Sequence, residues 1–166
     1  LAKNKFNVPV VVGGSMPTVV PRVMIENPNI DYLFEGEAEV AFIELMEALM
    51  KDGDVSKVAN LWYQENGVTK NTGIVKYLDM DEIPFQKLDF WDDKHFNKPY
   101  NGKLYVTGFF EASRGCMHKC HYCINRAFQI FQEESGKVRR NKSVEKIISE
   151  IKSIHKKRNF ELIMFT

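Results

Sequence analysis

Cysteine is scarce in this sequence of 166 residues, and its three copies all lie between positions 116 and 123. An odd number of thiols cannot pair internally without leaving one over, which argues against the disulfide frameworks of small secreted domains. We therefore expect a reducing compartment in which all three cysteines remain thiols and can bind a metal.

Features of membrane and exported proteins are also missing. The longest apolar run is far shorter than the roughly 20 residues that span a bilayer. The N-terminal residues have no cationic start followed by an apolar core and a small-residue cleavage site. We expect a cytoplasmic protein with no membrane span. With 44% hydrophobic residues, the chain is long enough for one globular domain or for pieces of two.

Several common catalytic patterns are absent from the sequence as well. It has no Ser/His/Asp set, paired-carboxylate site, phosphate-binding G-x-x-x-x-G-K loop or aromatic-basic RNA motif. The four histidines are scattered, and we assign none of them a catalytic role. No catalytic residue and no substrate are predicted.

Charge is distributed unevenly although the net charge is only +1. Residues 1–100 carry 10 basic and 16 acidic side chains, whereas residues 101–166 carry 13 and 6. The basic part would attract nucleic acid, phosphate or a carboxylate-bearing cofactor, or it is simply the solvated face of a lysine-rich helix at 142–158. The change of sign near residue 100 favours a domain boundary there.

Alternating strands and helices are predicted for the first part of the chain. VPVVVGG, at 8–14, indicates a buried parallel strand that ends in a tight turn, and residues 30–34 indicate a second strand. A helix should follow, with Glu35, Glu37 and Glu39 at its positive N-terminal end and Gly53 after it. Its predicted apolar stripe comprises Ala38, Ala41, Phe42, Leu45, Met46 and Leu49. This order is typical of a doubly wound α/β layer.

A hairpin and a connecting segment follow. Asn66-Gly67 supplies the positive φ angles of a tight turn between two strands. Residues 77–100 are rich in Asp, Pro and aromatics without a steady period, and we interpret them as a linker that wraps the surface.

The last part of the chain reads as strand, cysteine loop, helix and strand. The strand begins at Lys103, and Ser143 is placed to cap the helix. A buried strand, FELIMFT, comes last. Such a unit cannot cover both faces of its sheet, which indicates the start of a larger α/β domain. The helix has an apolar stripe of Val144, Ile147, Ile148, Ile151 and Ile154, and basic residues Lys156, Lys157 and Arg158 at its C-terminal end.

The cysteines stand at a C-x3-C-x2-C spacing, which lets a short backbone turn point three sulfurs at one centre. Zinc is one candidate, with His118, His121 or a distant group as fourth ligand. An electron-transfer 4Fe-4S cluster is a second, although it needs a fourth cysteine that the sequence lacks. The third is a 4Fe-4S cluster whose fourth iron stays open for a substrate or cofactor.

At these residues the sequence resembles the radical S-adenosylmethionine enzymes, whose hallmark is this spacing with an aromatic residue before the third cysteine, here Tyr122. The resemblance implies that Cys116, Cys120 and Cys123 hold a 4Fe-4S cluster and that S-adenosylmethionine binds its open iron. It also implies that Tyr122 lies against the adenine, the alternative being a tyrosine that packs the loop. Arg140, Ser143 and Glu145 resemble the segment that opens the next helix in these enzymes.

The first hundred residues resemble the second half of the cobalamin-binding domain found in one subgroup of that family. VVGGSMPT, IDYLFEGEAEVAFIELMEAL, the hairpin and LDMDEIPF occur in the subgroup's order. The resemblance implies that Gly13 and Gly14 let the backbone approach cobalamin without a Cβ in the way. We interpret Glu35 and Glu37 as charges at the helix N-terminus rather than as ligands.

The fold expected from this resemblance is α/β: the C-terminal part of a Rossmann-like cobalamin-binding domain, followed by the start of a partial TIM-type radical barrel. The predicted bounds are 1–76 for the first domain with its hairpin, 77–100 for the linker and 101–166 for the start of the barrel.

The expected function is reductive cleavage of S-adenosylmethionine to a 5′-deoxyadenosyl radical, with methyl transfer through cobalamin or another radical rearrangement. Flavodoxin or ferredoxin would donate the electron, and no nucleic-acid partner is expected. This chain alone should be inactive, since later barrel strands supply most contacts to S-adenosylmethionine. The alternative hypothesis is a zinc-stapled nucleic-acid-binding module without catalysis.

Overall fold

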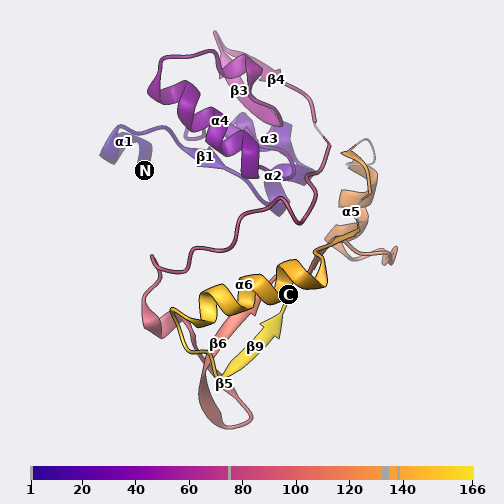
Figure 1. Cartoon of the computed structure of the whole chain (residues 1–166). Helices are drawn as coiled ribbons and strands as arrows, with labels where there is room; N and C mark the ends of the chain where they lie inside the picture. The colour runs from indigo at the N-terminus through magenta and orange to yellow at the C-terminus, as the bar shows by residue number, and fades with distance from the viewer. Residues whose placement is uncertain (1, 75, 132–134, 138) are drawn as a thin grey trace. The chain divides into compact units, whose positions relative to one another are not determined.

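The computed structural model describes residues 2–74, 76–131, 135–137 and 139–166 (Figure 1). Helices and strands are mixed along the chain, which confirms the α/β class. The chain divides into two compact units. Unit 1 contains Leu1–Tyr77 and Met117–Val138, and unit 2 contains Leu78–Cys116 and Arg139–Thr166. The boundary between them therefore passes through the cysteine loop.

Unit 1 is built on a four-stranded sheet with the order β1-β2-β3-β4. Strands β1 and β2 are parallel, as predicted for the first two strands, and β2, β3 and β4 are antiparallel. The elements of unit 1 are α1 (Ala2–Phe6), β1 (Val11–Val12), α2 (Ser15–Val19), α3 (Pro21–Ile25), β2 (Tyr32–Phe34), α4 (Glu39–Met50), the 3-10 turn η1 (Val55–Lys57), β3 (Leu61–Glu65), β4 (Val68–Asn71) and α5 (Ile124–Phe131).

The predicted hairpin is confirmed. Glu65 pairs with Val68, so that Asn66 and Gly67 form a two-residue turn between β3 and β4. Their φ angles are 51° and 75°, and positive values at both positions match the twist of the flanking strands.

Helix α4 packs its apolar face on this sheet. Ala41 and Leu45 are buried in a cluster with Phe34 and Leu61. Phe42, predicted to share the buried stripe, is instead 46% exposed. Its ring is in an edge-to-face arrangement with the Phe34 ring, with the ring centroids 6.3 Å apart. The helix contacts the strands along one apolar stripe, and Phe42 lies at the edge of that stripe.

The interpretation of Glu35 as a charge at the helix N-terminus is wrong, whereas Glu37 directly precedes the N-cap residue of α4. Helix α4 begins at Glu39, after the N-cap residue Ala38. Glu35 is buried, and its Oε2 accepts a hydrogen bond from the Trp62 indole N–H at 2.6 Å. A buried carboxylate needs such a partner, so Glu35 stabilises the contact between β2 and β3.

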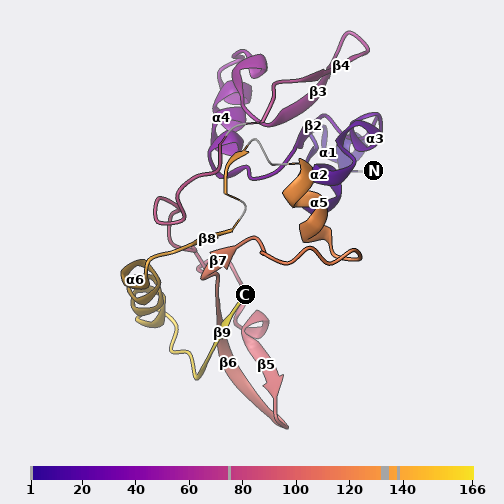
Figure 2. The same cartoon turned by 90° about the vertical axis from the view of Figure 1, so that its right-hand side faces the viewer.

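Unit 2 places helix α6 on a three-stranded sheet with the order β5-β6-β9 (Figures 1 and 2). Strand β5 is antiparallel to β6, whereas β9 is parallel to it. A parallel pair joined through a helix is the βαβ arrangement of α/β folds. The elements of unit 2 are the 3-10 turn η2 (Asp93–His95), β5 (Asn97–Tyr100), β6 (Lys103–Phe110), β7 (Ser113–Arg114), β8 (Arg140–Asn141), α6 (Val144–His155) and β9 (Leu162–Phe165).

The core of unit 2 consists of Phe96, Phe110, Ile154 and Phe160. Ser143 caps α6 as predicted, its side chain accepting from the Lys146 N–H at 3.1 Å. The predicted apolar stripe is only partly buried, since the side chains of Val144 and Ile148 are exposed.

Strand β9, predicted to be buried, is mostly exposed. Ile163, Met164 and Phe165 keep 39%, 40% and 59% of their surface accessible. Within the described residues β9 pairs with one strand only, β6. Its apolar residues suit a strand that is covered on both sides, as in a larger parallel sheet.

Residues 77–100, predicted as a linker, contain strand β5 and form ion pairs with the residues that follow helix α6. Lys157 pairs with Asp89 at 2.8 Å, and Arg158 pairs with Asp93. The uneven charge of the sequence is thus partly neutralised inside unit 2, where acidic residues before position 100 pair with basic residues just after the last helix.

Among the described residues, every helix is too short or too polar to cross a bilayer.

Candidate functional site

A short strand pair closes the base of the cysteine loop. β7 and β8 are antiparallel, with Ser113 opposite Asn141 and Arg114 opposite Arg140, and Figure 2 shows them side by side. The Lys142 N–H continues the ladder by donating to the Ala112 carbonyl oxygen at 3.0 Å. Residues 115–139 therefore form an excursion whose two ends are held together.

The first cysteine follows this base directly. Gly115, next to β7, has a φ of 80°, a left-handed conformation that glycine adopts without strain. Gly115 is the one residue between Arg114, the end of β7, and Cys116. On the strand side, the Arg114 Nε donates to both carboxylate oxygens of Glu111 at 3.0 Å, which fixes the chain where it leaves β6.

The second and third cysteines share one turn of backbone in unit 1. The Cys123 N–H donates to the Cys120 carbonyl oxygen at 3.2 Å, and the Cys123 carbonyl oxygen accepts from the Arg126 N–H at 3.0 Å. Cys123 thus lies at the start of α5. This helix was not predicted, because Asn125, Arg126 and Gln129 interrupt its short apolar pattern.

Gln129 of α5 reaches back to the loop. Its side-chain amide donates to the His118 carbonyl oxygen at 3.1 Å, in the stretch between the first two cysteines. Sequence reasoning missed this residue, since a polar side chain on a short helix carries no signal of its contact.

The three cysteines are chemically suited to the predicted 4Fe-4S cluster with one open iron. None of the three cysteines is in a disulfide; Cys116 and Cys123 are half-buried and Cys120 is exposed. Sulfur ligands are those that iron–sulfur clusters use, and three of them leave one iron without a protein ligand. Cys116 belongs to unit 2, whereas Cys120 and Cys123 belong to unit 1. Within residues 2–74, 76–131, 135–137 and 139–166, no three Cys, His, Asp or Glu side chains are arranged as ligands of one metal ion.

Tyr122, the predicted adenine contact, is 93% exposed. The alternative of a tyrosine packed into the loop therefore does not describe its side chain. An exposed aromatic ring beside the cysteines has its face available for stacking, and the contact with adenine stays a prediction.

A second candidate site lies at the carboxyl ends of β1 and β2. Parallel strands end at the same edge of a sheet, where open α/β folds bind their ligands. Gly13 and Gly14 follow β1 directly. Gly14 has a φ of 98° and is the N-cap of α2; a Cβ at Gly13 would lie 3.9 Å from the Phe34 Cβ, an ordinary contact.

Thr18 connects the two strand ends. Its Oγ1 donates to the Gly14 carbonyl oxygen at 2.8 Å and accepts from the Gly36 N–H at 3.0 Å. Gly36 belongs to the turn after β2, so one buried hydroxyl holds both turns. We did not predict Thr18; its place four residues after Gly14, where a threonine can bond back to a helix-cap carbonyl, is the available signal.

The part of the cysteine loop that belongs to unit 1 lies near the second candidate site. Helix α5, which begins after Cys123, lies against α2, which begins after Gly14. Figure 2 shows the two helices adjacent. The turn predicted to meet cobalamin and the turn with Cys120 and Cys123 are therefore next to neighbouring helices.

The basic residues of α6 form internal contacts. Lys146 Nζ donates to the Asp81 carbonyl oxygen at 2.8 Å and lies 4.8 Å from the centre of the Phe85 ring. The Asp81 carboxylate accepts from the Ser143 N–H at 2.8 Å. Hydrogen bonds from Ser143, followed by the nearby charges of Lys146 and Lys142, hold the pKa of Asp81 below its usual value.

No protein-family model matches the chain. Among solved structures, the fold is similar to that of the radical S-adenosylmethionine methyltransferase TsrM from Kitasatospora setae, with a TM-score of 0.63 and 15% identity over 99% of this chain and 31% of that one. It is also similar to the cobalamin-dependent S-adenosylmethionine radical enzyme OxsB, with a TM-score of 0.63 and 20% identity over 93% of this chain and 20% of OxsB. The chain thus has the fold seen in the corresponding part of these two enzymes.

Among curated proteins, the chain is 35% identical over 159 residues to the uncharacterized methyltransferase PH0819 of Pyrococcus horikoshii. The match covers 93% of this chain and 32% of PH0819. The chain thus spans about a third of the length of this relative. One of the TsrM structures contains cobalamin and a [4Fe-4S] cluster.

Proposed function

We propose that the chain is part of a radical S-adenosylmethionine enzyme in which Cys116, Cys120 and Cys123 hold a 4Fe-4S cluster. The observation that carries this proposal is the three-thiol donor set between β7 and α5, in a chain with the fold of cobalamin-dependent members of the class. When bound, such a cluster leaves one iron open and supplies the electron that breaks a carbon–sulfur bond of S-adenosylmethionine, giving methionine and a 5′-deoxyadenosyl radical.

The chain's own residues would bind the cluster and orient S-adenosylmethionine. Cys116 is presented by the β7–β8 base, and Cys120 and Cys123 by the turn that starts α5. All three would bind as thiolates, so loading releases protons. Tyr122 would offer its exposed ring to the adenine.

Cobalamin is the second proposed cofactor, held in part at the β1 and β2 ends. Gly13 and Gly14 would let it approach the backbone, and Thr18 keeps the two turns in register. The packing of α5 on α2 supports a reaction that uses both cofactors. Methyl transfer through cobalamin is therefore the reaction class we propose, with another radical rearrangement as the second candidate. The domain bounds given above, 1–76, 77–100 and 101–166, are part of this proposal, and flavodoxin or ferredoxin is the proposed external electron donor.

Anaerobic reconstitution of the full-length gene product with iron and sulfide tests the proposal. We expect about four irons per chain, a 4Fe-4S absorption and, after reduction, an EPR signal that changes when S-adenosylmethionine is added. A triple Cys116/Cys120/Cys123→Ala variant should lose all of these. Met117→Ala, which removes an exposed side chain of the same loop, is the matched control and should keep them.

Two results would contradict the proposal. One is an unchanged cluster signal in the triple variant. The other is stoichiometric zinc in the purified protein with salt-dependent nucleic-acid binding, as the zinc-module hypothesis requires.

A further inference from the structure

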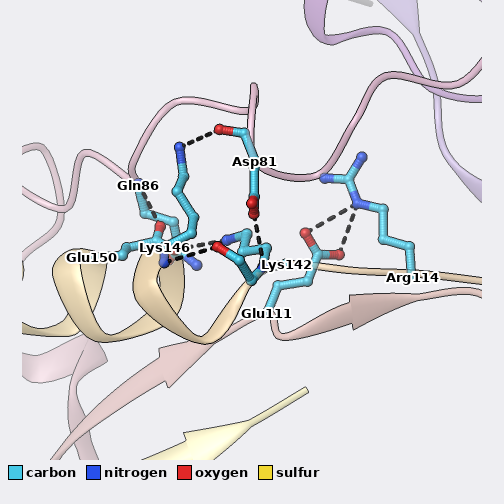
Figure 3. A network of polar contacts seen from close by, with 8 residues as sticks. Asp81, Gln86, Glu111, Arg114, Lys142, Lys146 and Glu150 are labelled. Carbon is cyan, nitrogen blue, oxygen red and sulfur yellow. Dashed lines mark hydrogen bonds and ion pairs between the residues drawn. The ribbon is translucent and has the colours of Figure 1, made fainter.

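A buried ion pair lies behind the base of the cysteine loop, in unit 2 (Figure 3). Lys142, the residue after β8, places its Nζ 2.7 Å from Glu150 Oε2, and the two side chains are only 2% and 1% exposed. Glu150 lies in the middle of α6, one turn before the core residue Ile154 and on the same side of the helix. Removing two charges from water is costly, and an apolar pair of similar volume is often at least as stable.

The second carboxylate oxygen of Glu150 has a different partner. Oε1 accepts the backbone N–H of Gln86 at 3.0 Å. One buried side chain therefore joins three segments: the end of β8, helix α6 and the chain at position 86. An apolar residue could fill the same space, but it could not accept hydrogen bonds from a lysine and a backbone N–H and so could not orient them.

Two neighbouring contacts strengthen this connection. Asp81, five residues before Gln86, accepts from the Ser143 N–H and receives the Lys146 ammonium on its carbonyl oxygen. Figure 3 shows this set beside the Glu111–Arg114 pair, at the point where the chain enters β7. Residues 81–86 are thus held against the segment 142–150 at three points.

We infer that Glu150 is a positioning residue for Cys116. The Glu150 carboxylate binds the Lys142 ammonium. The Lys142 N–H in turn bonds the Ala112 carbonyl oxygen, next to the β7–β8 pair that precedes Cys116. In assigning Cys116 as a cluster ligand, the inference rests on the proposed function. Its structural content, that the buried pair restrains the first cysteine and not the other two, is independent of the cluster.

Thiol labelling of the full-length apo-protein tests this content directly. The rates at which iodoacetamide modifies Cys116, Cys120 and Cys123 are measured by peptide mass spectrometry. In Glu150→Gln we expect Cys116 to react about tenfold faster, because a buried pair that has lost one charge opens locally more often. Cys120 and Cys123, which lie in unit 1, should keep their rates.

A double variant distinguishes a local effect at Cys116 from general unfolding. Lys142→Met/Glu150→Leu removes both charges with little change of volume, so the fold should persist, while Gln86 and the base of the loop lose their polar anchor. We expect selective acceleration at Cys116 here too, and several-fold faster loss of iron from the reconstituted protein under a chelator. Lys157→Gln is the matched control, since it breaks an exposed ion pair between Asp89 and a residue just after α6 and should change neither rate.

Each outcome bears on the inference. Equal acceleration of all three cysteines would mean general destabilisation and would overturn it. So would a folded double variant with wild-type labelling at Cys116. If the wild-type protein binds no cluster but Cys116 is selectively accelerated, the positioning role stands and the proposed function fails.

Discussion

The side-chain amide of Gln129 and the carbonyl oxygen of His118 are joined by a hydrogen bond of 3.1 Å. The bond links α5 to the middle of the C-x3-C stretch, whose residues Met117, His118 and Lys119 are exposed. Because an exposed stretch has few packing contacts, one side-chain bond has a large share in defining its path.

Gln129→Leu should loosen this stretch without unfolding unit 1. A side-chain hydrogen bond contributes about 0.5–1.5 kcal/mol, so we expect a small change in the denaturation midpoint but clearly faster loss of iron after reconstitution. Iron and sulfide content after repeated gel filtration measures the effect. Ile130→Gln, on the same helix with an exposed side chain, is the control; equal iron loss in both variants would argue against a role for the bond.

Gly13 and Gly14 should respond differently to alanine. Gly14 has a φ of 98° and a ψ of −161°, a region that costs other residues of order 1–3 kcal/mol, so Gly14→Ala should lower stability by that amount. Gly13→Ala meets only an ordinary contact at 3.9 Å and should leave the free energy of unfolding nearly unchanged.

Measuring cobalamin affinity then distinguishes a structural role of this turn from a role in binding the cofactor. If the backbone at Gly13 lies against the cofactor, Gly13→Ala weakens cobalamin affinity in a protein of normal stability, which spectroscopic titration of the full-length protein would reveal. Wild-type affinity in this variant would remove Gly13 from the proposed site.

Gly108→Ala should strongly destabilise unit 2. A Cβ at Gly108 would lie 2.7 Å from both Phe110 Cε2 and Phe160 Cδ2, at the centre of the aromatic core. Overpacking of this kind costs about 1–3 kcal/mol, measurable as a lower urea midpoint. Phe160→Leu in the same chain should recover part of the loss because it vacates the space. If Gly108→Ala has wild-type stability, β6 does not pack on Phe160 as described.

Periodicity in the sequence predicted the long elements well. The hairpin at Asn66-Gly67, helix α4 and the Ser143-capped helix α6 are local features, and their signals are turn chemistry, apolar spacing and capping. The helices α2, α3 and α5 were missed, because five to eight residues give too few turns for a periodic pattern.

Pairing between distant segments was harder to predict. β5 lies in the segment interpreted as a linker, and what makes it a strand is its partner β6 rather than its own composition. For the candidate site, the spacing gave the three cysteines, but no local pattern encodes the bond between Thr18 and Gly36 or the bond between Gln129 and His118. Glu150 had a readable signal, a carboxylate on the apolar face of a helix.

Asp81 should make unit 2 sensitive to acid. Its pKa in the folded protein is lowered, mainly by the hydrogen bond from the Ser143 N–H. A group with a depressed folded pKa adds stability above its unfolded pKa, near 3.9, and loses that contribution as the pH falls through the folded value.

Asp81→Asn should therefore flatten the fall in stability between about pH 5 and pH 2, the range in which unfolded and folded aspartates titrate. Urea midpoints at several pH values measure the slope. The slope should not vanish, since hydrogen bonds and charges also lower the pKa of Asp54, Asp89 and Asp92. Asp52→Asn controls for the loss of one surface charge, and an unchanged slope in Asp81→Asn would contradict the assignment.

The parallel pairing of β6 with β9 brings together residues far apart in the chain, such as Thr107 and Leu162. At translation rates of about 5–20 residues per second, β9 is made roughly 3–11 s after β6. All three thiols are synthesised before β8 and β9, so the cysteine loop is closed by the β7–β8 pairing only after its cysteines have been made.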